Sequence, residues 1–100
     1  MYAKRGSPPD EGNTDMALFV IERNFAEQLN LEELDYAGVK LVNDEAGVRW
    51  LHSFLSPDKK KTYCFYEAPN ADGIRDAAAR LGIPADVIVE VEQFGPGPVP

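Results

Sequence analysis

The middle of the chain, from Trp50 to Pro69, has the pattern of two β-strands joined by a short charged turn. Residues 48–55 and 61–67 are rich in aromatic and other apolar side chains, and a proline, an aspartate and lysines lie between them. A hairpin brings residues on its two strands within a few ångströms of each other. The only Trp, the only His and the only Cys of the chain all lie in this segment. The hairpin therefore constrains the fold and also directs the search for a functional site.

One strand pattern and one helix pattern flank the hairpin on each side. Before it, residues 16–22 form a short apolar run that predicts a strand, and a helical pattern runs from Asn30 to about Gly47. After it, residues 70–81 predict a helix that Gly82 ends, and residues 86–94 predict a last strand. We expect the first helix to bury a stripe of residues at helical spacing: Leu31, Leu34, Gly38, Leu41 and Val42.

The resulting order, β-α-β-β-α-β, predicts a ferredoxin-like α+β fold with a four-stranded antiparallel sheet. Both helices of such a fold cover the same face of the sheet, so the other face meets solvent, a ligand or a partner. Alternation in the second strand predicts two apolar faces, with Val48, Trp50, His52 and Phe54 on one and Leu51 and Leu55 on the other. We therefore expect a homodimer of the dimeric α/β barrel type, in which a second subunit covers the open face.

Composition describes one small domain. The chain has 100 residues, of which 44% are hydrophobic, and we place the domain at 16–94 between flexible tails at 1–15 and 95–100. A net charge of −7 argues against binding to nucleic acid or to an anionic membrane. No run approaches the roughly 20 apolar residues of a membrane helix. The single cysteine and the lack of an apolar signal segment favour a cytoplasmic location.

His52 and Cys64 are the residues of the hairpin best suited to bind a metal ion, and the turn decides whether they share a face. A two-residue turn centred on Asp58 and Lys59 places His52 opposite Phe65 and sends Cys64 to the other face. A three-residue turn centred on Lys59 places both on one face. In the second case an imidazole and a thiolate, completed by a carboxylate, could bind nickel, cobalt, copper or zinc. From spacing alone, burial in a core or an interface is the more common role for such residues.

The hairpin and the helix after it resemble one known family. The hairpin has the pattern HSxxSxDxxKTxC from His52 to Cys64, and the helix end has the pattern AAxxxGxPxD from Ala77 to Asp86. Together they resemble the bacterial family called domain of unknown function 4242, over about residues 16–91. The resemblance implies a ferredoxin-like fold, a dimer and nickel binding. It places His52, Asp58, Cys64 and Glu67 at matching positions, which makes these four the candidate metal ligands.

Two hypotheses of function follow. The first is a nickel-binding or other transition-metal-binding protein that buffers, stores or senses the metal without catalysis. The second is a cofactor-free monooxygenase or isomerase of the dimeric α/β barrel type, with His52 as the acid–base group and Tyr66 as a hydrogen-bond donor. A closed apolar pocket that reaches His52 favours the enzyme, whereas an open cluster of His, Cys and carboxylate favours metal.

Overall fold

The computed structural model describes residues 16–97, so the predicted tail at 1–15 and the last three residues lie outside the described part. Residues 95–97 are exposed and belong to no helix or strand. The elements, in chain order, are β1 (Ala17–Asn24), the short 3-10 helix η3 (Leu31–Glu33), α1 (Tyr36–Ala46), β2 (Arg49–Leu55), β3 (Lys61–Ala68), α2 (Ala71–Leu81) and β4 (Val87–Val91).

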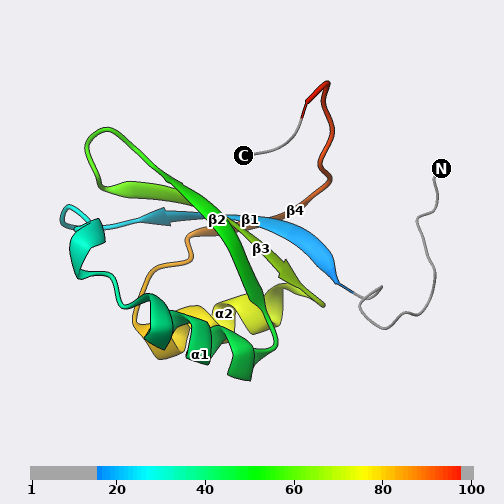
Figure 1. The fold of residues 1–100 in the computed structure, drawn as a ribbon, viewed down its shortest axis with the longest axis horizontal. Coiled ribbons are helices and arrows are strands. Elements are labelled where there is room, and N and C mark those ends of the chain that lie inside the picture. Colours follow the sequence, from blue (N-terminus) through cyan, green and yellow to red (C-terminus); the bar gives the residue numbers. More distant parts are fainter. Residues whose placement is uncertain (1–15, 98–100) are drawn as a thin grey trace.

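The strands form one antiparallel sheet in the order β2-β3-β1-β4. Both helices lie on the same side of this sheet, below it in Figure 1. The element order and the four-stranded sheet confirm the predicted ferredoxin-like α+β fold. The sheet therefore has a helix-covered face and an open face, and each candidate residue can be assigned to one of them.

The core lies between the helices and the two central strands, β1 and β3. Alternate residues of both strands point toward the helices, because successive side chains of a strand point to opposite faces. Ile21 and Ile74 are the largest side chains that are completely buried there. The rest of the buried apolar cluster consists of Phe19, Val48, Cys64, Tyr66, Ala68 and Ala77.

The second helix matches its prediction, and the first does not. Asn70 accepts a hydrogen bond from the Asp72 backbone at the start of α2, and Gly82 ends the helix with a left-handed φ of 69°. Asn30, in contrast, caps only the three-residue helix η3. The α-helix begins at Tyr36, where the Asp35 side chain accepts from the Gly38 backbone.

The prediction that one helix starts at Asn30 is therefore wrong, because Asp35 provides a second N-terminal cap. The predicted apolar stripe is right only in part. Leu31 lies outside α1, and Leu41 is 60% exposed. Val42, a member of the predicted stripe, does pack against the core, together with Ala46, and Asn43 is buried in the same helix.

A β-bulge changes the faces of β2. The pairing with β3 shifts between Trp50 and His52, so Leu51 is an extra residue in this strand. Trp50 pairs with Tyr66, on the helix-covered face, whereas His52 pairs with Phe65, on the open face. The prediction that Trp50 and His52 share a face is therefore wrong. Simple alternation cannot reveal an inserted residue.

Candidate functional site

The hairpin turn settles the relation between His52 and Cys64. Leu55 pairs with Thr62, and the Ser56 backbone N–H donates to the Lys61 carbonyl at 2.9 Å. This register is that of a turn centred on Asp58 and Lys59, in which His52 opposes Phe65 and Ser53 opposes Cys64. His52 is on the open face and Cys64 is on the helix-covered face. The two predicted metal ligands are separated by the sheet.

His52 lies among aromatic rings on the open face. Its ring centroid is 4.9 Å from that of Phe65, with the planes 27° apart, and 5.6 Å from that of Phe54, at 80°. Its Nε2 atom is buried and has no hydrogen-bond partner among the described residues. A buried polar atom without a partner is costly, so a ligand at this nitrogen would stabilise the protein. Nε2 is also the atom through which neutral histidine commonly binds metals.

Cys64 has a different environment. The side chain is 6% exposed, and its thiol lies 3.5 Å from the Thr62 hydroxyl on the helix-covered face. A buried thiol among apolar neighbours behaves as a small hydrophobic group. Among residues 16–97, Cys64 belongs to no group of three or more His, Cys, Asp or Glu side chains that could hold a metal ion.

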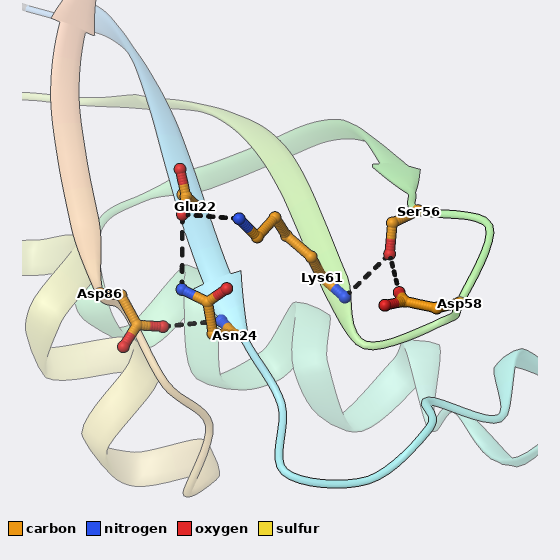
Figure 2. Close-up of polar contacts among 6 residues, drawn as sticks. All are labelled: Glu22, Asn24, Ser56, Asp58, Lys61 and Asp86. Carbon is orange, nitrogen blue, oxygen red and sulfur yellow. Dashed lines mark hydrogen bonds and ion pairs between the residues drawn. The ribbon is translucent and has the colours of Figure 1, made fainter.

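Asp58 lies in the turn, where its carboxylate is already engaged. Asp58 Oδ1 accepts from the Ser56 hydroxyl at 2.7 Å (Figure 2). It also accepts from the Lys60 backbone N–H at 3.0 Å. The Ser56 hydrogen bond, followed by that of Lys60, holds the pKa of Asp58 below its usual value of 3.8. This carboxylate therefore organises the turn. Asp58 lies in the turn between β2 and β3, whereas the other three candidate ligands lie within these strands.

Glu67 shares the open face with His52. It pairs with Leu18 of β1 and Arg49 of β2, and its Oε1 lies 3.6 Å from the Arg49 guanidinium. Residues two positions apart on a strand share a face, so Glu67 is a diagonal neighbour of His52 across the hairpin. Of the four candidate ligands, these are the two that the fold places on one surface.

Much of this surface is apolar and exposed. Four of its side chains are each between 40% and 46% exposed, namely Phe54, Tyr63, Val87 and Val89. Charged pairs lie beside them. Lys61 Nζ is 3.2 Å from Glu22 Oε2 on the same face (Figure 2), and the Glu22 hydrogen bond raises the pKa of Lys61. The open face thus combines an apolar centre with ion pairs.

The four predicted ligands do not form one metal site within a single chain. Among residues 16–97, no three His, Cys, Asp or Glu side chains lie close enough together to hold a metal ion. The Nε2 atom of His52 has no partner among residues 16–97, but a metal ion bound there would need donors beyond those that gather around it in one chain. The part of the chain that the structure describes therefore shows no complete metal site, and His52 stays a predicted ligand.

The helix-covered face holds a feature that sequence reasoning missed. A cavity of about 400 Å³ lies between the sheet and the segment that runs from η3 into α1, and Arg23, Cys64 and Tyr66 are among its lining residues. His52 does not line this cavity. The cavity therefore does not favour an enzyme in which His52 is the acid–base group. Arg23 is 3% exposed. Arg23 continues the alternation of Phe19 and Ile21. This pattern would have predicted the burial of Arg23 if the expected strand had continued past Glu22.

The described part of the chain holds no helix long and apolar enough to cross a membrane. The predicted cytoplasmic location stays a prediction.

The family model described as nickel responsive protein SCO4226-like matches residues 19–91. The crystal structure of SCO4226 from Streptomyces coelicolor A3(2) superposes with a TM-score of 0.64 at 20% sequence identity, covering 79% of this chain and 100% of that one. A search of curated proteins finds no match. The matched family has a different description from the domain of unknown function 4242, and the confirmed part of that resemblance is a nickel-related family with this fold.

Proposed function

We propose, because the chain belongs to the SCO4226-like family of nickel responsive proteins, that it binds a transition metal ion, with nickel as the first candidate. The proposed role is buffering, storage or sensing of the metal, without catalysis. The description of the family names nickel. His52 is the residue of this chain whose side chain is best suited to bind that metal.

The single observation that carries the proposal is the unpartnered Nε2 atom of His52 on the open face. Imidazole nitrogen is a suitable ligand for nickel, and carboxylate oxygen can complete such a site. Glu67 is the carboxylate of the same face, across the hairpin from His52. Binding through Nε2 would satisfy a nitrogen that the folded chain leaves without a hydrogen bond.

A second copy of the chain would complete the ligand set. One chain offers too few donors among its described residues, and the donors it does offer lie on an apolar face that packs against nothing in that chain. Two copies that face each other through their sheets would bury this face and would bring two imidazoles and two carboxylates to one interface. The exposed Val87 and Val89 would lie in the same contact. The homodimer is thus part of the proposed function, because the metal site is incomplete without it.

The test is calorimetric titration of nickel into full-length protein purified without a histidine tag, after its metal content has been measured. We expect His52→Ala to abolish binding or to weaken it by more than about tenfold, since removing a ligand of a transition metal costs well over 1.4 kcal/mol. We expect Glu67→Gln to weaken it as well. Glu45→Gln is the matched control, because it removes the same charge from α1, where the side chain is exposed.

Unchanged stoichiometry and affinity in His52→Ala would remove His52 from the metal site. A wild-type protein that contains no metal and ignores added nickel would contradict metal binding altogether. A change of similar size in Glu45→Gln would show that nickel binds to surface carboxylates without selection.

A further inference from the structure

Arg23 carries a buried positive charge without a negative partner among residues 16–97. The residue is 3% exposed, and none of the described carboxylates lies within 4.0 Å of its guanidinium. Its Nη1 donates to the Pro84 carbonyl at 2.6 Å and its Nη2 donates to the Tyr66 hydroxyl at 3.3 Å. Both acceptors are neutral. Burial raises the pKa of Tyr66, so the phenol stays protonated at neutral pH and supplies no counter-charge.

An uncompensated buried charge costs several kcal/mol, and proteins usually pair it with an opposite charge. Arg23 is also part of the wall of the 400 Å³ cavity on the helix-covered face. A guanidinium has five N–H donors in a planar arrangement, and the two hydrogen bonds above leave three of them. Carboxylate and phosphate groups both match this arrangement. The single negative charge of a carboxylate balances Arg23, which is the one charged side chain among the described residues in the wall of the cavity.

A second polar group lies beside the guanidinium. Thr62 is the direct partner of Arg23 across β1 and β3, and both side chains are buried on the helix-covered face. The Thr62 hydroxyl accepts from the Cys64 thiol at 3.5 Å. Its own hydrogen is donated to no other described side chain, which leaves it available to an acceptor in the cavity.

The rest of the wall is mostly apolar. Aliphatic and aromatic residues from the segment after β1, from α1 and from the end of α2 surround the cavity, among them Phe25, Leu34, Val39 and Ile83. Two further lining residues, Leu31 and Tyr36, are 48% and 58% exposed, so they mark the side on which the cavity reaches solvent. Ligand pockets typically have volumes of about 300–1,000 Å³ with a few polar groups in an apolar wall. This cavity has that composition and that size.

We propose that this cavity binds a small organic acid, whose carboxylate pairs with Arg23 and Thr62 and whose apolar body lies against Leu34, Val39 and Ile83. The net charge of −7 does not oppose such a ligand, because charges farther apart than about 8 Å are largely screened at physiological salt. The cavity and the proposed nickel site lie on opposite faces of the sheet. Either can therefore exist without the other.

Octanoate and its neutral analogue octanamide are the probes. Each is titrated into the full-length protein by calorimetry, with the fluorescence of the only tryptophan as a second signal, since Trp50 lines the cavity and stacks on Tyr36 at 5.7 Å. We expect octanoate to bind at least about tenfold more tightly than octanamide, because hydrogen bonds to charged groups are the stronger ones. Equal affinities, or no binding of either probe, would overturn the proposal.

Three variants locate the bound acid. Arg23→Gln should abolish the preference for the acid over the amide. Val39→Phe should reduce binding of both probes by at least about tenfold, because the larger ring occupies the cavity, whereas Leu41→Phe, at an exposed position of the same helix, should change neither. If Arg23→Gln fails to fold, the wild-type preference and the contrast between Val39→Phe and Leu41→Phe decide. Octanoate binding that persists unchanged in Val39→Phe would contradict the proposed site.

Discussion

His52 and Cys64 lie on neighbouring strands but on opposite faces of the sheet. His52 pairs with Phe65, and the next residue of β2, Ser53, pairs with Cys64. A difference of one residue in register reverses the face of a side chain. A single metal ion therefore cannot bind His52 and Cys64 of the same chain. The two residues belong to different parts of the protein: His52 belongs to the open face, and Cys64 belongs to the buried core and the wall of the cavity.

Replacing the thiol should therefore leave metal binding intact. We expect Cys64→Ser to bind nickel with the stoichiometry and affinity of the wild type, because the thiol is 6% exposed and faces the helices. Calorimetric titration checks this, and thiol labelling of the native protein should be slow for the same reason. Loss of nickel binding in Cys64→Ser would mean that the thiol reaches the metal in a different arrangement of the chain.

The turn of the hairpin should contribute a pH-dependent term to stability. The pKa of Asp58 is lowered in the folded state by its hydrogen bonds to Ser56 and Lys60. Its stabilising contribution is thus complete above its ordinary value of about 3.8 and is lost as the pH falls through the lower folded-state value. The difference in unfolding free energy between wild type and Asp58→Asn should shrink across that range, as measured by denaturant titration.

Ser56→Ala is the companion variant for this prediction, because it removes the hydrogen bond with the largest effect on Asp58. It should make the acid dependence of stability weaker than in the wild type. A difference between wild type and Asp58→Asn that stays constant from neutral pH to well below 3.8 would contradict the role of the carboxylate in the turn.

The end of α2 should be sensitive to any side chain at Gly82. Its φ of 69° is left-handed, and this conformation costs non-glycine residues about 1–2 kcal/mol. We expect Gly82→Ala to lower the unfolding free energy by about 1 kcal/mol. Gly97→Ala is the control, since it lies in an exposed segment with open space around it and no left-handed φ. Equal unfolding free energies of Gly82→Ala and Gly97→Ala would contradict the role of Gly82 as the cap of α2.

The open face should be the dimer contact. We expect Val89→Glu to convert a dimer into a monomer in sedimentation analysis, because it places a charge on the apolar surface of the open face, where Val89 of β4 is 46% exposed. Leu41→Glu introduces the same charge at a 60% exposed position of α1 and should leave the dimer intact. If Leu41→Glu dissociates the dimer and Val89→Glu does not, the contact lies on the helix side instead.

The fold followed from local sequence signals that tertiary structure did not override. Asn70 and Gly82 delimit α2 because their side-chain and backbone preferences act within one turn. The start of α1 was missed because Asn30 and Asp35 are both acceptable caps, and nothing local ranks them. The faces of β2 were missed because the bulge at Leu51 depends on how the strand packs, which no periodic pattern contains.

The candidate site was predictable only in part. The sequence named His52, Asp58, Cys64 and Glu67 through the family resemblance, and it left the turn register open, because both turns suit the residues from Ser56 to Lys61. The structure selects one of them. The cavity could not be predicted from the sequence, since a cavity is a property of packing between distant segments. The burial of Arg23 was not predicted because the expected strand ended at Glu22, one residue before it. An arginine at the end of a predicted strand normally has a solvated head group.

Native mass spectrometry of the tag-free protein shows directly whether the nickel site needs two subunits. Nickel is added to wild type and to Val89→Glu, and the metal content of monomer and dimer is read separately. We predict that nickel is bound by the dimer and not by the monomer, and that Val89→Glu loses the dimer and the metal together. A monomer that binds nickel as tightly as the dimer, or a dimer that binds none, would contradict it.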